Sequence, residues 1–135
     1  MREQISFIVG LVGGFFGYFL GGLDVLLSVF ATILVLDTLA GMLKAWNKGE
    51  YESKIFRKGI FNKCGYLIAI LLAVQIDILM GGSGLLRNAV LTGFIANEGM
   101  SIMENLGALG IKFPAKFKNA IKSLKENNKK SEPEE

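Results

Sequence analysis

The polar side chains that could support chemistry in this sequence lie within long apolar stretches. They are Asp37, Asp77, Asn97, Glu98, Ser101 and Glu104. Polar and charged groups inside a membrane are energetically costly, so they usually pair with one another, pack against protein or face water. These residue types therefore indicate intramembrane pairing, a water-filled lumen or proton movement.

The residue inventory excludes most catalytic and metal sites. The chain has no histidine and a single cysteine, Cys64, which excludes His-based catalysis, a Cys-cluster zinc site and an intramolecular disulfide. We find no nucleophile–base pair or phosphate-binding loop, and the glycines at 81–84 indicate a turn. We therefore expect a protein that is not an enzyme and needs no cofactor or metal.

Three interpretations of the two isolated aspartates stay open. Asp37 can pair with Lys44 or Lys63, and Asp77 lies at a similar depth to Arg87 on a neighbouring helix. Alternatively, both carboxylates face an aqueous lumen in an oligomer. The third interpretation is a role in proton-coupled transport.

The polar residues of the stretch 85–109 recur at helical spacing and gather on one side. A single copy in lipid cannot hide Asn97, Glu98, Ser101 and Glu104 without partners. They can pack against the other helices or line a water-filled hole made by several copies. A segment lying on the membrane surface is the remaining alternative.

The elements that position these residues are apolar helices. Of the 135 residues, 51% are hydrophobic, and the only charged side chains from Gln4 to Leu43 are Asp24 and Asp37. This segregation indicates an all-α membrane protein with four transmembrane helices in two hairpins. The expected spans are residues 5–23, 25–46, 60–80 and 85–109. Asp24 is expected to cap the second helix after a break at the preceding glycines.

The remaining segments are polar. We expect a loop over residues 47–58, a basic amphipathic helix over 111–126 and a disordered tail over 127–135. The basic helix suits an anionic membrane surface better than nucleic acid. Its membrane-facing cations are Lys116, Lys118, Lys122 and Lys125. Because the loop and the tail are both basic, we expect a multi-pass protein with cytoplasmic N- and C-termini.

Glycines recur at small-xxx-small spacing in the first apolar stretch. They are Gly10, Gly13, Gly14, Gly17 and Gly21. Such a face lets two helix backbones approach closely in lipid. It predicts helix packing, against either another helix of the same chain or a second copy.

The motifs together resemble a known family. Asp37, Gly41 and Ala45 match a D-x-x-x-G-x-x-x-A segment. A polar block at 95–105 ends in S-I-x-x-N, and Gly110-Ile111-Lys112-Phe113-Pro114 matches G-[IVL]-x-x-P. These motifs follow the order of the family over residues Leu34 to Lys125. The sequence therefore resembles the phage-lysis and toxin-secretion holins of Gram-positive bacteria and their phages, which include the clostridial toxin-secretion holins.

The resemblance implies a small protein that oligomerises in the bacterial cytoplasmic membrane and permeabilises it. A phage endolysin or a large toxin then leaves the cytoplasm, and in phage infection the host cell lyses. The residues that match family positions are Asp37, Asn97, Glu98 and Glu104. Two other functions stay open: a small four-helix proton-coupled multidrug-type transporter, and a membrane anchor or scaffold that recruits a partner through its basic tail.

Overall fold

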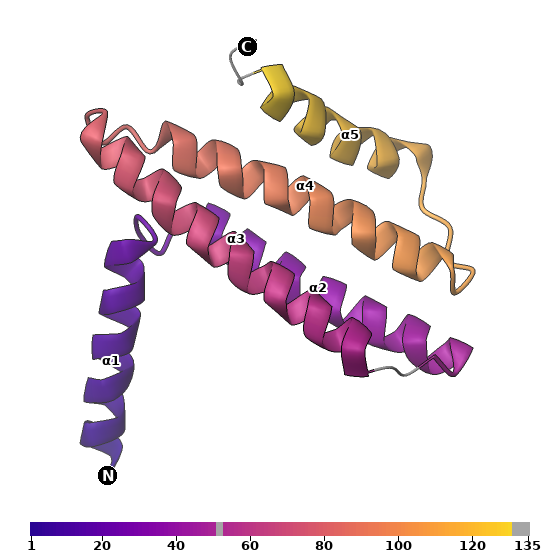
Figure 1. Ribbon diagram of the computed structural model, residues 1–135, viewed down its shortest axis with the longest axis horizontal. Helices are drawn as coiled ribbons and strands as arrows, with labels where there is room; N and C mark the ends of the chain where they lie inside the picture. The colour runs from indigo at the N-terminus through magenta and orange to yellow at the C-terminus, as the bar shows by residue number, and fades with distance from the viewer. Residues whose placement is uncertain (51–52, 131–135) are drawn as a thin grey trace.

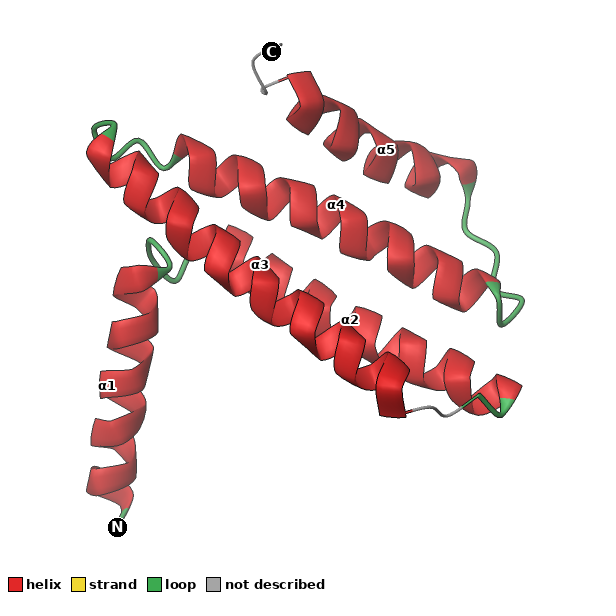
Figure 2. Cartoon of the chain, in the orientation of Figure 1, coloured by secondary structure: helices red, strands yellow, loops and turns green. Residues whose placement is uncertain are grey.

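The computed structural model describes residues 1–50 and 53–130, and all regular structure in them is helical (Figure 2). The helices are α1 (Arg2–Phe19), α2 (Val25–Lys48), α3 (Ser53–Leu79), α4 (Leu85–Gly107) and α5 (Ala115–Lys130). The predicted all-α class is therefore confirmed. The boundaries follow glycine turns and capping residues more closely than they follow hydropathy.

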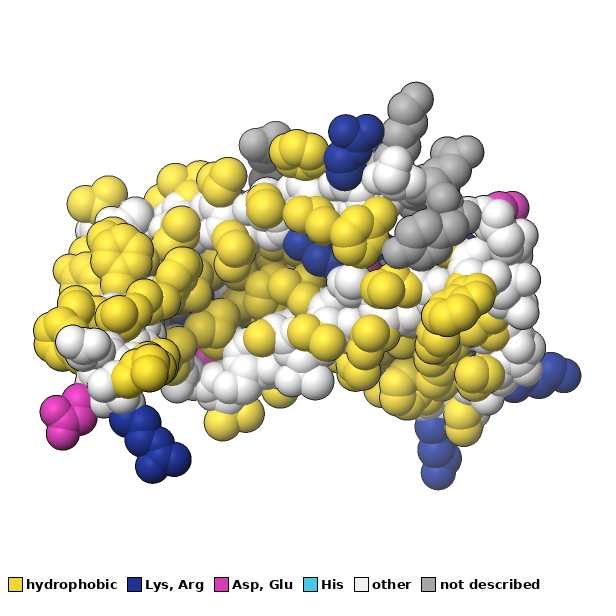
Figure 3. All heavy atoms as spheres, turned by 90° about the horizontal axis from the view of Figure 1, so that it is seen from below, with side chains coloured by type: hydrophobic (Ala, Val, Ile, Leu, Met, Phe, Trp, Pro, Cys, Tyr) yellow, Lys and Arg dark blue, Asp and Glu magenta, His cyan; other side chains and the backbone are white. Residues whose placement is uncertain are grey.

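Two of these helices are long and apolar enough to cross a membrane. They are Val25–Lys48, with a mean hydropathy of 2.1, and Phe56–Leu79, with 1.6. Only 17% of each apolar segment is buried inside the chain. A core helix of a soluble protein would bury its apolar face, whereas here hydrophobic side chains cover much of the surface seen in Figure 3. The helices therefore suit a lipid environment.

Helix α4 lies at the centre of the helix arrangement (Figure 1). Helices α2, α3 and α5 each pack against it, and α2 does so most extensively. Helix α2 runs in the same direction as α4, whereas α3 and α5 run in the opposite direction. Phe30, Ile70 and Leu91, from α2, α3 and α4, are the largest fully buried side chains. Tyr66 and Phe94 stack beside them with ring centroids 4.2 Å apart.

The two helix pairs that the sequence predicts as hairpins are arranged differently. Helices α3 and α4 run antiparallel and are joined by a turn with positive φ at Gly81, Gly82 and Gly84. Helix α1 instead diverges from α2 and touches the bundle only near its own C-terminal end (Figure 1). The α1–α2 turn, which Arg87 binds, fixes where α1 begins to diverge.

Helices α1 and α3 both end in the same glycine-dependent way. The N–H of Gly22 donates to the Gly17 carbonyl at 2.7 Å, and the N–H of Gly82 donates to the Asp77 carbonyl at 2.7 Å. Each closes a Schellman motif, which needs a left-handed residue that glycine adopts without strain. Helix α1 therefore ends at Phe19, earlier than the predicted residue 23.

Two polar segments are more helical than predicted. Helix α3 begins at Ser53, so the predicted loop 47–58 is short, and its residues 51–52 lie outside the described part. Helix α5 continues to Lys130, beyond the predicted end at 126. Lysine is a good helix former, and the terminal Lys129 and Lys130 complement the helix dipole. Residues 131–135 of the predicted tail lie outside the described residues.

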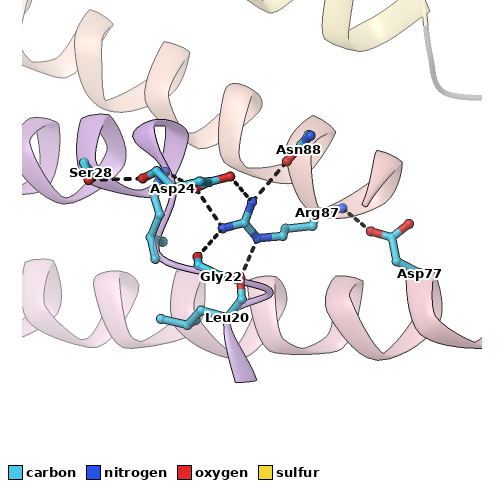
Figure 4. Close-up of polar contacts among 8 residues, drawn as sticks. Leu20, Gly22, Asp24, Ser28, Asp77, Arg87 and Asn88 are labelled. Carbon is cyan, nitrogen blue, oxygen red and sulfur yellow. Dashed lines mark hydrogen bonds and ion pairs between the residues drawn. The ribbon is translucent and has the colours of Figure 1, made fainter. Parts of the chain in front are cut away.

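Arg87 holds the α1–α2 turn against the start of α4 (Figure 4). Its guanidinium donates two hydrogen bonds to the Asp24 carboxylate, at 2.8 and 3.0 Å. It also donates to the backbone carbonyls of Leu20 and Gly22. Gly21 leaves the space for this side chain, because a Cβ there would lie 2.7 Å from Arg87 Cδ. Gly21 therefore serves this turn instead of the predicted helix–helix face.

Asp24 combines two roles at the start of α2. Its Oδ1 accepts a hydrogen bond from the Leu27 N–H at 3.0 Å, which confirms the predicted cap. The hydrogen bonds from Arg87 lower the pKa of Asp24 to about 2. The stabilisation from this carboxylate is therefore present above its ordinary pKa and is lost as the pH falls toward about 2.

Asp77 and Arg87 meet as predicted, but through different groups. Asp77 accepts from the backbone N–H groups of Leu86 and Arg87 at 3.0 and 2.8 Å. The carboxylate at the end of α3 thus satisfies N–H groups of the first turn of α4, which have no partner within the helix. The Arg87 guanidinium points away from Asp77 toward the α1–α2 turn.

Replacing Arg87 with methionine should destabilise the chain by about 1–3 kcal/mol, because the carbonyl of the buried Leu20 and the partly exposed Asp24 carboxylate lose their donor. Arg87→Lys should recover only part of the loss, since an ammonium cannot reproduce the guanidinium fork. The measurement is the melting temperature in detergent, with the exposed Arg2→Met as the control. An unchanged melting temperature for Arg87→Met would contradict the assigned role.

Candidate functional site

One face of α4 carries three polar side chains that each reach a neighbouring segment. Arg87, Glu98 and Asn105 are 11 and 7 residues apart, which is close to three and two helical turns. Arg87 meets Asp24, Glu98 meets Lys63, and Asn105 accepts from Lys44 at 3.3 Å. The polar side of this stretch can be predicted from the sequence, but the partners at its three levels cannot.

The middle level is a network of four side chains from three helices. Lys63 Nζ of α3 lies 2.9 Å from Asp37 Oδ2 of α2 and 2.8 Å from Glu98 Oε2 of α4. The Tyr66 hydroxyl donates to the other Glu98 oxygen at 2.7 Å. The side chains of Lys63, Asp37 and Glu98 are only 21%, 14% and 9% exposed. At formal charges, two carboxylates share one ammonium in a largely desolvated place.

The network supports one of the interpretations left open for Asp37. Asp37 pairs with Lys63 rather than with Lys44. Ser101 of α4 lies beside the same carboxylate. The second oxygen, Asp37 Oδ1, is buried without a hydrogen-bond partner. Within the described residues, Asp37 and Glu98 are thus engaged by contacts inside one chain.

A cavity of about 300 Å³ lies between the network and the α2–α3 connection. Asp37 and Lys63 form one part of its lining, and Lys44 and Asn105 form another. Met42, Phe56 and Ile60 contribute apolar walls. The polar network is therefore separated from the end of the bundle by a partly apolar chamber.

Two other predicted residues of α4 lie on a different face. Asn97 and Glu104 are both exposed, and Ser101 between them is half-buried. Their spacing of i, i+4 and i+7 places all three along one side of the helix. We find neither α2, α3 nor α5 covering Asn97 or Glu104 among the described residues. The predicted pore-lining set therefore divides into residues paired internally and residues that face outward.

The predicted glycine face of α1 is largely open. A Cβ at Gly10, Gly13 or Gly14 would meet no atom within 4 Å, whereas one at Gly17 would lie 3.2 Å from Leu23 Cγ. The described helices of this chain therefore leave most of this face uncovered.

The predicted basic residues of α5 are all exposed. They are Lys116, Lys118, Lys122 and Lys125. Helix α5 has no buried residue, although it packs along α4. Its lysines therefore remain available to an external anionic surface.

Sequence reasoning missed Tyr66 and the partner of Arg87. Tyr66 follows Lys63 by three residues, so both lie on one face of α3 and reach Glu98 together. That spacing was a usable signal. The contact between Arg87 and Asp24 spans 63 residues and had no local signature.

Lys63→Met should destabilise the chain by about 3 kcal/mol, because it leaves two buried carboxylates without their cation. Glu98→Gln should cost about 1 kcal/mol, since the amide still accepts from Tyr66 and leaves Lys63 paired one-to-one with Asp37. Melting temperatures in detergent and accumulation in membranes test the difference. The double variant Lys63→Met/Glu98→Gln should be more stable than Lys63→Met alone. Equal losses for the two single variants would contradict the network.

Comparisons with known proteins link the chain to phage proteins through its family match and a phage relative. The model of the bacteriophage holin family matches residues 14–126. An uncharacterised protein of Listeria monocytogenes is 39% identical over 121 residues, covering 90% of this chain and 86% of that protein. An uncharacterised 14.9 kDa protein of Clostridium perfringens is 38% identical over 134 residues, covering 96% of this chain and all of the relative.

A phage relative carries a functional name. The probable holin of Bacillus phage phi105 is 31% identical over 102 residues, with 76% of each chain covered. No solved structure matches the chain. The family match spans most of the sequence and includes both polar faces of α4. The chain therefore belongs to the bacteriophage holin family, whose members are not enzymes.

Proposed function

We propose that this protein is a holin that oligomerises in the bacterial cytoplasmic membrane and permeabilises it. The opening lets a cytoplasmic endolysin reach the cell wall, which leads to host cell lysis. A large toxin is the other cargo that this route would serve. The family and the name of the phage relative support the proposal. The structural observation that carries it is the outward polar face of Asn97 and Glu104 on the central helix.

That polar face is difficult to reconcile with a single copy in lipid. A charged side chain at the centre of a membrane helix costs on the order of 3 kcal/mol. The inward carboxylate of α4, Glu98, meets the Lys63 ammonium and the Tyr66 hydroxyl. Glu104, three residues before the end of α4, has no ion pair among the described residues. Packing several copies around a common lumen would place Asn97 and Glu104 against water.

The open glycine face of α1 supports self-association. In lipid, apolar burial gives no driving force between helices, so close backbone packing supplies the attraction. Gly10, Gly13 and Gly14 offer a smooth surface that the described chain leaves uncovered. Helix α1 also diverges from the bundle, which makes it accessible to a second copy (Figure 1).

We propose a topology of four spans with both termini in the cytoplasm. Helices α2 and α4 run in one direction, and α3, which lies between them in the sequence, runs in the opposite direction. This arrangement is compatible with three successive membrane crossings. The basic residues near the α2–α3 connection and in α5 favour the cytoplasmic side for those segments. Helix α1 would then be the first crossing.

The decisive experiment is co-expression with a muralytic enzyme that has no export signal. Induction should leave the membrane potential intact for a period and then collapse it abruptly, and lysis should require the enzyme. The enzyme alone is the control. High levels of the protein in the membrane with the potential preserved would overturn the proposed function.

Cysteine labelling tests which face of α4 meets water. In a Cys64→Ser background, Asn97→Cys and Glu104→Cys should react with a membrane-impermeant thiol reagent after permeabilisation and much less before it. The matched control is Ile68→Cys, which replaces a side chain that is 68% exposed on the apolar surface of α3. Labelling of Ile68→Cys at the same rate as Glu104→Cys would contradict a water-lined α4 face.

A further inference from the structure

Helix α5 is seated on glycines of α4. A Cβ at Gly99 would lie 2.7 Å from Ile121 Cδ1, and one at Gly93 would overlap Asn128 Nδ2. Ile121 and Asn128 are seven residues apart, or two turns, and therefore lie on one face of α5. The tips of these two side chains thus lie over the two glycines, and a Cβ at either glycine would push the tip aside.

This docking is shallow. Ile121 and Asn128 are the half-buried residues of α5, and the others in this helix are exposed. Phe117 and Leu124 of its apolar stripe remain 47% and 39% exposed. The apolar side of α5 is therefore only partly used by α4, and much of it remains free for another apolar environment.

The docked position conflicts with the membrane position of α4. Because α4 packs along α2 and α3, it lies at the depth of helices that suit the membrane interior. Helix α5 runs antiparallel beside it, which would take Lys118, Lys122 and Lys125 to the same depth (Figure 1). Lysine ammoniums without partners are strongly disfavoured there, whereas the surface of an anionic membrane attracts them.

We propose that α5 is a reversible cover of α4, and that its transfer to an anionic lipid surface is required before the protein permeabilises the membrane. The two glycines of α4 and the lipid headgroups compete for the same helix, since its apolar stripe and lysines serve both positions. While α5 is docked, α4 cannot take its place in a lipid-embedded bundle. This inference rests on the proposed function and adds the step that controls it.

A disulfide lock tests the cover directly. Gly93→Cys and Asn128→Cys, introduced together in a Cys64→Ser background, place two thiols where a Cβ at 93 would already lie 3.4 Å from Asn128 Cγ. The protein is reconstituted into vesicles of phosphatidylcholine alone or of equal parts phosphatidylcholine and phosphatidylglycerol. Release of a trapped dye is measured for the oxidised and the reduced forms, with each single-cysteine variant as a control.

The oxidised double variant should release little dye, and reduction should restore release to the level of the single variants in the phosphatidylglycerol vesicles. The disulfide should also form more slowly in those vesicles than in phosphatidylcholine alone, because anionic lipid draws α5 away. Equal release by the oxidised and reduced forms would overturn the cover. If neither the reduced nor the parent protein releases dye, the proposed function fails. In that case the rate of disulfide formation still tests whether anionic lipid competes with α4 for α5. Equal rates in both kinds of vesicle would overturn this competition.

A pair of matched substitutions gives a second test without a disulfide. Ile121→Ser and Leu124→Ser each remove one apolar residue from the stripe of α5, but Ile121 lies over Gly99. Ile121→Ser should shorten the delay before the membrane potential collapses, relative to Leu124→Ser. Identical delays for the two variants would contradict docking as the controlling contact.

Discussion

The cost of placing charge in an apolar environment is the constraint on which the rest of this structure depends. Helix α4 carries more polar side chains than a single membrane helix tolerates in lipid, so the neighbouring segments pack where they can pair with those side chains. Three polar residues of α4 are each paired with a residue distant in the sequence: Arg87 with Asp24, Glu98 with Lys63, and Asn105 with Lys44. The position of α4 at the centre of the bundle follows from this requirement.

The same constraint explains why the acidic residues have different roles. Asp77 satisfies N–H groups at the start of α4, and Asp37 and Glu98 share Lys63. These carboxylates are structural, which weakens the case for a free coupling carboxylate of a proton-driven transporter. Glu104 and Asn97 have a different position, because the bundle leaves them outward. A protein that assembles around water has a use for such residues, and a solitary bundle does not.

The two peripheral helices are attached more loosely than the central three. Helix α1 is held at its end by the turn that Arg87 binds, and α5 rests on two glycines of α4. Both helices keep large surfaces that the chain does not cover. A compact centre held by paired polar side chains, with two loosely held outer helices, fits the proposed holin function, in which outer helices rearrange.

The sequence by itself determined the helical class, the turns at 21–24 and 81–84, the Asp24 cap and the polar side of α4, because these depend on local periodicity and on glycine and capping preferences. It also indicated the family through motifs spread along the chain. Only the tertiary structure decided which polar residues have an ion-pair or hydrogen-bond partner. Glu98 and Glu104 look alike in sequence, yet one meets Lys63 and the other faces outward. Those contacts join residues tens of positions apart, and the divergence of α1 and the docking of α5 likewise depend on surfaces that form only when the helices pack.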